Sequence, residues 1–292
     1  MLGFLNLHKP PGMTSHDCVG RVRRILGLKR VGHGGTLDPL ATGVLPIALG
    51  SATRLLPYLP EPKAYQATIR FGITTATDDL GGEILSQQTA GHLAKGDVEQ
   101  ALVRFQGCIQ QQPPAYSAIQ VNGQRLYDLA RQGQPVSAPI RTVEIMAIQV
   151  LAWQSTERPE VEVAITCGSG TYIRSIARDL GEYLGTGATL AQLIRTRSCG
   201  LFLSDSLTFE ALESQVSQGT FTPLSPSLVL KQPILSLSPI AAQRFSWGQK
   251  LPESDYPDGW VQVRDNCDRF LGIGEIREGL LRPKVVYLWS EE

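Results

Sequence analysis

The amino-acid sequence predicts an α+β protein with a small β domain at its C-terminal end. Residues 64–71 and 161–167 alternate apolar and polar side chains, as half-buried strands do, and residues 141–153 predict a further strand. Helical patterns fall between the strands at irregular intervals, without the βαβ rhythm of a doubly wound sheet. From about residue 240 onward, short strand patterns alternate with turn residues, which indicates a small barrel.

The first 60 residues predict two strands around one helix. Residues 4–7 form a short apolar strand, which the prolines and the glycine at 10–12 end. Ser15 is the expected N-cap of a helix over about 15–26, where apolar residues recur at helical spacing. A glycine-rich loop then leads to a buried strand at 44–49 and a short helix at 53–59.

Residues 64–105 predict a strand, a hairpin and a helix. Tyr65 and every second residue after it to Phe71 are apolar, so this strand should bury one face. A polar tip at 74–82, which contains Asp79, should lead into a returning strand at 83–85. The helix that follows has Asp97 as its expected N-cap.

Residues 110–135 are interpreted as an insertion that projects from the core. The paired prolines 113–114 disfavour a helix at its start, and 123–131 predicts a short helix with two arginines. Beyond the strands at 141–153 and 161–167, residues 168–175 lead into a helix that ends near Leu184.

Tyr172 and Arg174 lie in the first turn of this helix, where side chains can reach a site beyond the strand ends. An apolar segment at 188–197 follows, and the composition then shifts to Ser, Gln and Pro between 205 and 240. A short helix at 207–215 and a connecting segment are expected there. We therefore expect one domain at 1–235 and a second at 236–292.

The composition excludes several classes of protein. With 42% hydrophobic and 18% charged residues, the 292-residue chain is globular and not disordered. No apolar run approaches the roughly 20 residues that span a bilayer, and the N-terminus lacks the pattern of a secretory signal. The five cysteines are odd in number and form no CxxC pair, so we expect a reduced, cytoplasmic protein without a zinc site.

The charge is balanced over the chain but not along it. The formal net charge is zero, yet residues 1–60 contain seven basic side chains and two acidic ones. The basic residues are Lys9, Arg21, Arg23, Arg24, Lys29, Arg30 and Arg54. A local positive field of this kind attracts a polyanion such as RNA, although a solvated helix face would look similar.

A tightly turned loop at 31–43 presents an aspartate. It has four glycines and one proline in 13 residues, so its backbone must turn sharply. Pro39 restricts its own φ and favours an extended Asp38. A carboxylate held in this way is a candidate nucleophile or general base, but Asp, Pro and Gly are also ordinary turn residues.

Four separated segments resemble one family, the bacterial tRNA pseudouridine-55 synthases. They are residues 6–15, 32–43, 63–65 and 168–175. Residues 113–118 and 125–131 resemble the family's RNA-gripping insertion, and the last domain resembles its small RNA-binding (PUA-like) barrel. The resemblance implies the pseudouridine synthase fold, with a central mixed, mainly antiparallel sheet flanked by helices and a catalytic first domain.

The resemblance also implies roles for individual residues. Asp38 would be the nucleophile, with Arg174 paired to it. His33 would stack into the RNA where the target base leaves. Tyr65 would pack on the flipped uracil and take part in proton removal.

Further matched positions would line or support the pocket. Tyr172 and Leu193 would line the uridine pocket, while Lys9 and Pro10 would support its wall. Asp79 also falls on a family position, without an assigned role.

The expected reaction is the isomerisation of uridine-55 in the T-loop of tRNA. It replaces the base's nitrogen–sugar bond by a carbon–sugar bond with no net redox change, so no metal or cofactor is needed. The base must leave its stack, which costs a few kcal/mol. A carboxylate can add to the base or to the sugar carbon, and both routes stay open. The expected partner is the T-arm of tRNA. We expect the protein to be a monomer that binds no membrane and needs no obligate protein partner.

Three alternatives stay open at this point. The first is a guide-RNA-dependent relative that modifies ribosomal RNA with several protein partners. The second is an RNA-binding folding factor without catalysis. The third is a hydrolase with Asp38 as a glycosidase nucleophile, which would need a second carboxylate as acid.

Overall fold

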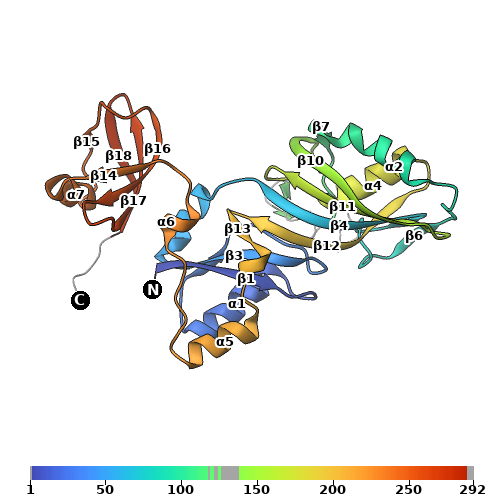
Figure 1. The fold of residues 1–292 in the computed structure, drawn as a ribbon, viewed down its shortest axis with the longest axis horizontal. Coiled ribbons are helices and arrows are strands. Elements are labelled where there is room, and N and C mark those ends of the chain that lie inside the picture. The colour runs from blue at the N-terminus through green and yellow to red at the C-terminus, as the bar shows by residue number, and fades with distance from the viewer. Residues whose placement is uncertain (1, 118, 122–123, 126–137, 288–292) are drawn as a thin grey trace.

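A nine-stranded sheet forms the centre of the computed structural model, which describes residues 2–117, 119–121, 124–125 and 138–287 (Figure 1). Its main path runs through β1 (Leu2–Lys9), β3 (Thr42–Gly50), β12 (Ala188–Ser198), β4 (Lys63–Phe71), β11 (Glu160–Cys167), β10 (Arg141–Gln154) and β7 (Gly107–Gln111). Two short strands join it at the side: β2 (Val31–His33) pairs with β3, and β13 (Leu201–Phe202) pairs with β12. Among these described strands only β12 and β3 run parallel, so the predicted mixed, mainly antiparallel sheet is confirmed.

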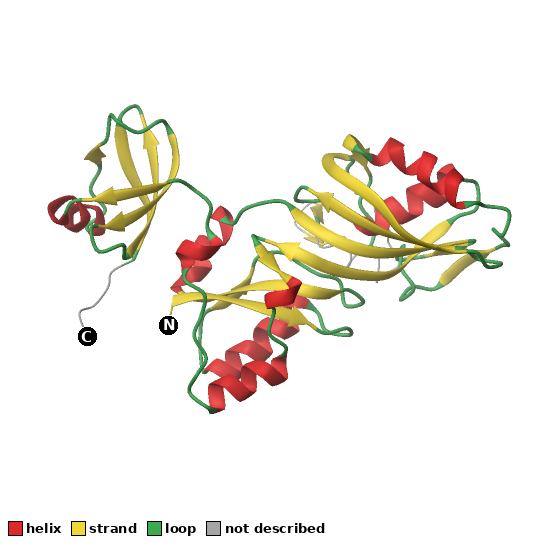
Figure 2. Cartoon of the chain, in the orientation of Figure 1, coloured by secondary structure: helices red, strands yellow, loops and turns green. Residues whose placement is uncertain are grey.

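Two helix pairs cover different parts of this sheet (Figure 2). Helices α1 (Ser15–Leu26) and α5 (Phe209–Ser217) pack on β1 and β3, where apolar side chains such as Leu45 and Ile47 are fully buried. Helices α2 (Lys95–Leu102) and α4 (Ile173–Tyr183) pack on β4, β11 and β12. The alternation predicted for 64–71 is confirmed, because Tyr65 and the odd-numbered residues after it are buried.

A glycine allows the two halves of the sheet to meet. Gly43 on β3 pairs with Arg195 on β12 and has a φ of 100°. A Cβ at this position would collide with the backbone of Arg195. Only glycine therefore fits where the strand after the Asp38 loop joins β12.

Neither residue predicted as an N-cap occupies the cap position. Thr14, not Ser15, caps α1: its side chain accepts from the backbone of Asp17, whose carboxylate accepts from the backbone of Thr14. Asp97 stands three residues after the cap position of α2, where it accepts from the backbone N–H of Ala94. In both helices the aspartate at the third position completes the cap.

The predicted insertion at 110–135 begins within the core. Strand β7 pairs with β10 along the edge of the main sheet, and Gln111, Pro113 and Pro114 are buried. The expectation that 110 and 111 project was wrong because their pairing partner lies 30 residues further along the chain.

The predicted helix at 123–131 lies mostly outside the described residues. Its one described part, β9 (Gln124–Arg125), pairs with β8 (Gln120–Val121) as a strand, so the helix prediction is wrong there. The hairpin predicted at 74–85 is confirmed as β5 (Ile73–Thr75) and β6 (Ile84–Gln87).

Short elements connect the longer strands and helices. They are the 3₁₀ helices η1 (Ser51–Tyr58), η2 (Val103–Phe105) and η3 (Leu203–Asp205) and helix α6 (Pro226–Val229), of which η1 and α6 lie near the second sheet. Residues 205–240 were expected to hold one helix and a connection, but they also hold α6 and the first strand of the second sheet. The sequence pattern did not predict this strand because it is stabilised by parallel pairing with a strand distant in the chain.

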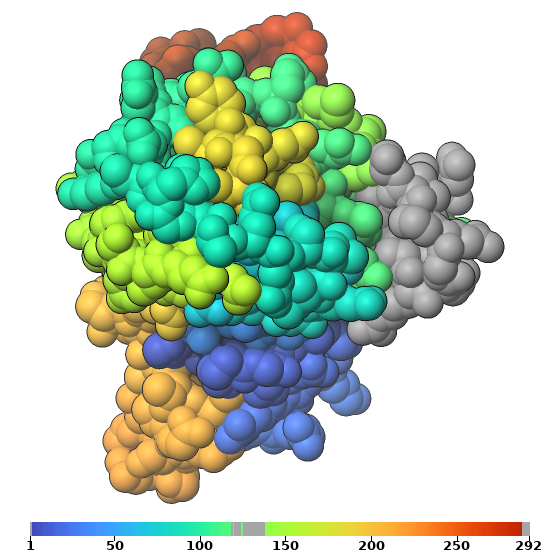
Figure 3. Space-filling view, turned by 90° about the vertical axis from the view of Figure 1, so that its right-hand side faces the viewer, coloured from blue at the N-terminus to red at the C-terminus, as the bar shows by residue number. Residues whose placement is uncertain are grey.

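The C-terminal part is a curled five-stranded sheet with one helix. The strand order is β14 (Ile234–Leu237), β16 (Gly259–Asp265), β17 (Phe270–Arg277), β18 (Leu280–Val286) and β15 (Leu251–Pro252), and α7 (Pro239–Ser246) covers its core. It joins the main sheet through a shared apolar cluster that contains Phe4, Leu55, Val229 and Phe270. Figure 3 views the opposite end of the molecule, where α4 reaches the surface.

Candidate active site

Asp38 lies on the loop between β2 and β3, with its side chain 35% exposed. The apolar residues on either side of it, Leu37 and Ala41, are buried in the core beneath α4. The loop is thus anchored by its neighbours while the carboxylate stays accessible to a substrate.

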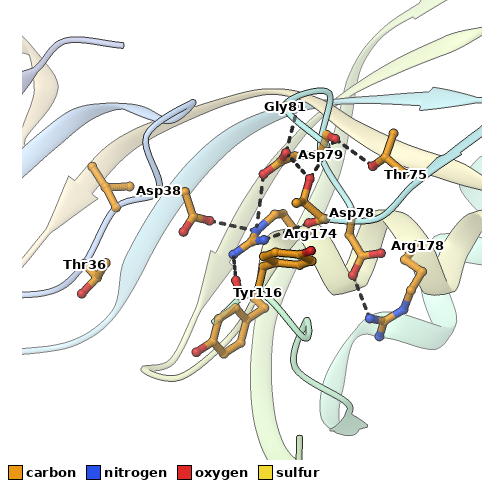
Figure 4. A network of polar contacts seen from close by, with 12 residues as sticks. Thr36, Asp38, Thr75, Asp78, Asp79, Gly81, Tyr116, Arg174 and Arg178 are labelled. Atoms are coloured by element: carbon orange, nitrogen blue, oxygen red, sulfur yellow. Dashed lines mark hydrogen bonds and ion pairs between the residues drawn. The ribbon is translucent and has the colours of Figure 1, made fainter. Parts of the chain in front are cut away.

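Arg174 holds this carboxylate from the first turn of α4 (Figure 4). Its Nε lies 2.9 Å from Oδ2 of Asp38, and its side chain is only 5% exposed. Nη1 donates to the carbonyl of Thr77 at 2.8 Å, and Nη2 donates to the carbonyl of Tyr116 at 3.0 Å. Three elements therefore meet at one guanidinium: the Asp38 loop, the β5–β6 hairpin and the segment after β7.

Asp79 is the second carboxylate beside Arg174. Its Oδ2 lies 3.8 Å from Nε of Arg174, and its side chain is 12% exposed. Its Oδ1 accepts from the hydroxyl of Thr77 at 2.7 Å and from the backbone N–H of Gly81 at 3.0 Å. These contacts fix the hairpin tip, and in both hydrogen bonds the carboxylate is the acceptor.

Tyr65 and Leu193 lie in the core beside the loop. They stand on the paired strands β4 and β12, and they belong to the same apolar cluster as Leu37 and Ala41. Their exposed fractions are 8% and 6%. Burial raises the pKa of Tyr65, and the nearby guanidinium of Arg195 opposes that rise.

Tyr172 stands directly before α4. Its backbone N–H donates to the side chain of Gln111 at 2.8 Å, and its carbonyl accepts from the same side chain at 3.0 Å. This pair of bonds ties the start of α4 to the end of β7. Burial raises the pKa of the Tyr172 phenol, so it is protonated at neutral pH.

His33 ends β2 at the entrance to the loop. Its Nδ1 accepts from the backbone N–H of Gly35 at 3.4 Å. Burial and the positive charge of Arg195 lower the pKa of His33, so the ring is neutral at neutral pH. A neutral ring suits insertion into a stack of bases.

Lys9 supports the loop from below, at the end of β1. It is fully buried, and its Nζ donates to the carbonyls of Pro10, Pro39 and Ala41 at 2.9, 3.2 and 2.6 Å. Burial lowers the pKa of Lys9 to about 8, although the charge of Asp38 acts in the opposite direction. Pro10 thus takes part through its backbone.

Sequence reasoning missed two residues that contact the loop backbone. Ser15 exchanges hydrogen bonds with the backbone of Leu37, and Arg195 donates to the carbonyls of Gly35, Thr36 and Val44. Two basic residues, Arg195 and Arg197, stand near the end of this apolar strand segment, and the sequence does not distinguish the one that contacts the loop.

A groove of about 570 Å³ runs along the sheet next to this site. It is lined by Leu40 from the loop, by Leu193 and Gln192 from β12, and by Arg70 and Glu160 from β4 and β11. Arg70 and Glu160 pair with each other at 2.6 Å. Within the described residues, no three His, Cys, Asp or Glu side chains gather closely enough to hold a metal ion. No helix in the described part of the chain is long and apolar enough to span a membrane.

The chain is similar to known proteins over nearly its full length. Residues 23–173 match the model "TruB family pseudouridylate synthase (N terminal domain)", and residues 233–287 match "Pseudouridine synthase II TruB, C-terminal". The chain is 72% identical to "tRNA pseudouridine synthase B" of Acaryochloris marina, with 98% of this chain and 99% of the relative covered. It is 55% identical to the protein of the same name from Trichormus variabilis, with the same coverage.

A solved structure shares the fold. In a Cbf5-Nop10-Gar1 complex, one chain superposes with a TM-score of 0.72 at 24% identity, covering 98% of this chain and 85% of that chain. This likeness confirms the predicted pseudouridine synthase fold. The matches in sequence confirm the family that the motifs indicated: the chain belongs to the TruB family of pseudouridylate synthases.

Proposed function

We propose that this chain is a tRNA pseudouridine(55) synthase (EC 5.4.99.25) that isomerises uridine-55 in the T-loop of tRNA with Asp38 as nucleophile. The Asp38–Arg174 pair is the observation that supports it best. The carboxylate is one-third exposed on an anchored loop, and a buried guanidinium 2.9 Å away orients it. The relatives named tRNA pseudouridine synthase B support tRNA as the substrate.

The flipped uridine would lie between Asp38 and the aromatic side of the site. Tyr65, Tyr172 and Leu193 are proposed to pack against the base, and neutral His33 to occupy the gap left in the RNA. Filling that gap offsets part of the cost of unstacking.

Proton removal is the more demanding role proposed for Tyr65. During the reaction a base carbon loses its proton as it bonds to the sugar, while the base nitrogen released from the sugar gains one. Tyr65 would accept a proton only as phenolate, which burial disfavours and the guanidinium of Arg195 favours.

The proposed division of labour follows the two sheets. The first domain, about 1–235, would carry the reaction, and the C-terminal domain would bind RNA; β14 and the C-terminal family match both start slightly before 236. We propose a monomer that acts without an obligate protein partner. A cytoplasmic location stays a prediction, with which the five free cysteines agree.

The test combines unmodified tRNA transcript with the purified protein alone and maps pseudouridine chemically. Wild type should modify position 55, and Asp38→Asn should bind the transcript but not turn over. Full activity of Asp38→Asn would remove Asp38 from the mechanism.

The same assay separates the alternatives. Tight binding without product would favour an RNA folding factor, and activity only with added guide RNA and proteins would favour the guide-dependent relative. Release of free uracil would indicate a hydrolase, for which Asp79, the other carboxylate beside Arg174, would have to act as the acid; its Oδ1 accepts hydrogen bonds from Thr77 and Gly81.

A further inference from the structure

A fully buried arginine on β12 grips the loop that carries Asp38. Arg195 is 0% exposed. Its Nε donates to the carbonyl of Val44 at 2.7 Å, Nη1 to that of Thr36 at 3.2 Å and Nη2 to that of Gly35 at 3.1 Å. One planar guanidinium thus spans the loop before and after the aspartate.

The partners of Arg195 are all neutral. Among the described residues it takes part in no ion pair with a carboxylate. A buried charge without an opposite charge is costly, and here three backbone carbonyls and the phenol of Tyr65 offset that cost. Because an apolar residue would be cheaper at the centre of a sheet, the guanidinium has a purpose beyond stability.

Arg195 completes a set of contacts that fixes the loop backbone. Beside the carbonyls of residues 35 and 36, Ser15 accepts from the N–H of Leu37 at 2.8 Å and donates to its carbonyl at 3.1 Å. The carbonyl of Asp38 accepts from the N–H of Ala41, and Lys9 takes the carbonyls of residues 39 and 41. A glycine-rich loop has many alternative conformations, and these contacts select one.

The register of the sheet places Arg195 between the nucleophile loop and Tyr65. Its backbone pairs with Gly43 on β3 and with Tyr65 on β4, and neighbours in register share a face. The side chain therefore lies beside the phenol of Tyr65 while it holds the loop.

We propose that Arg195 is a positioning residue for the reaction: its guanidinium fixes the loop so that the carboxylate of Asp38 meets the flipped uridine at the productive distance. This inference rests on the proposed function. Arg195 lies beneath the loop and acts on the substrate only through Asp38 and Tyr65. Its loss should therefore slow the chemical step and leave RNA binding intact.

The test measures single-turnover rate and RNA affinity separately, with unmodified tRNA transcript. The variants are Arg195→Lys, which keeps the charge but cannot reach three carbonyls at once, and Arg195→Gln. Arg158→Gln is the matched control, because Arg158 stands just before β11, beside the Phe71 end of β4 and away from the loop, and donates to the side chain of Gln87 at 3.0 Å. Unfolding curves and circular dichroism establish that each variant is folded.

Both Arg195 variants should lose about 30-fold or more in single-turnover rate, since a displacement of about 1 Å can cost 100-fold, with RNA affinity within about threefold of wild type. Arg158→Gln should keep both values. A folded Arg195→Lys with a wild-type rate would overturn the proposal, as would a loss confined to RNA affinity.

Should neither Arg195 variant fold, Ser15→Ala tests the same mechanism with a smaller change. It removes both contacts to Leu37, and it should lower the rate about tenfold at unchanged affinity. An unchanged rate in Ser15→Ala would then count against a positioned loop. Absence of pseudouridine with wild type would instead reject the proposed function, so the two failures are distinguishable.

Discussion

At the scale of single residues, the site depends on which group each nitrogen of the Arg174 guanidinium contacts. Arg174 directs Nε to Asp38 and its two terminal nitrogens to backbone carbonyls of separate elements. A lysine has one compact charge and cannot make these three contacts in fixed directions. The identity of the residue, and not only its charge, should matter.

Arg174→Lys should therefore lower the single-turnover rate about 100-fold, because the Asp38 carboxylate loses its oriented partner. Arg178→Lys is the control on the same helix: Arg178 pairs with Asp78 at 2.9 Å and does not contact Asp38. We expect that control to stay within about threefold of wild type. Equal losses in the two variants would mean that the hairpin, and not Asp38, needs the arginine.

Deprotonation of Lys9 should lower the single-turnover rate at alkaline pH. Its pKa is lowered to about 8 by burial, so the ammonium loses a proton as the pH rises through that value. The neutral amine has two donors for three carbonyls, and the loop at Pro39 and Ala41 loosens. The single-turnover rate should therefore fall on the alkaline side with an apparent pKa of about 8.

Lys9→Arg separates this effect from titration of the RNA. Arginine stays charged over the whole range, so its rate, although lower throughout, should lack the fall near pH 8. Cys18, Asp38, Arg195 and Asp17 are the ionisable neighbours of Lys9, and they are unchanged in the variant. The same alkaline fall in wild type and Lys9→Arg would rule out Lys9 as its source.

The nine site residues singled out in the sequence came from motifs, and the structure gathers them around one loop. The loop's glycines and Pro39 indicated a tight turn, and Asp38 indicated possible chemistry. The contacts of Arg195 and Ser15 with the loop were not predicted, because they are made to backbone carbonyls and N–H groups 22 or more positions away in the chain. Such contacts leave no pattern of side-chain types in the sequence.

At the scale of elements, α1 begins with two adjacent hydroxyl residues that have different tasks. Thr14 caps the helix, and Ser15 holds Leu37 of the loop. Either residue type is a good cap, so composition alone could not tell which one serves. The backbone geometry decides, because only Thr14 has the extended conformation of a cap, with ψ of 158°.

Thr14→Ala should therefore reduce the free energy of unfolding by about 1 kcal/mol and leave the single-turnover rate of the folded protein unchanged. Ser15→Ala should instead lower the single-turnover rate more than it lowers the free energy of unfolding. Denaturant unfolding and single-turnover assays on both proteins check this. Ser204→Ala, at an exposed position, provides the neutral reference. A rate loss in Thr14→Ala as large as in Ser15→Ala would contradict the separation.

Strands with strict alternation were predictable because one face is buried and the other is solvated. Tyr65 to Phe71 and Val161 to Cys167 show this over their whole lengths. The edge strand β7 and the short β14 were not predictable: each owes its conformation to a partner strand about 30 residues away, β10 and β16. Local patterns do not contain such pairings.

At the scale of the whole molecule, the C-terminal sheet packs against the part of the chain that holds the main sheet. The hydroxyl of Tyr287 donates to the carbonyl of Ser51 at 2.7 Å, and Arg54 donates to the carbonyl of Val286 at 3.1 Å. Tyr58 and Trp260 meet edge to face at 5.0 Å between ring centres. With the shared apolar cluster, these contacts favour one continuous surface for a large substrate.

The balanced net charge of the chain conceals a basic region near the site. Arg24 and Arg30, around the turn from α1 to β2, are exposed, and β2 leads directly to His33. If RNA phosphates lie there, each neutralised phosphate should add about 0.7 to 0.9 to the slope of log affinity against log salt.

Replacing both arginines with glutamine should lower RNA affinity and reduce that slope by about 1 to 2, because up to two phosphate contacts disappear. The single-turnover rate at saturating enzyme should stay within about threefold of wild type, since neither residue contacts Asp38. Binding measured at several salt concentrations checks both values. The matched control replaces Lys95 and Arg104, which are equally exposed on and after α2. Equal reductions of the slope in the two double variants would mean that only total charge matters; a reduction confined to Arg24 and Arg30 would place the RNA backbone along the approach to His33.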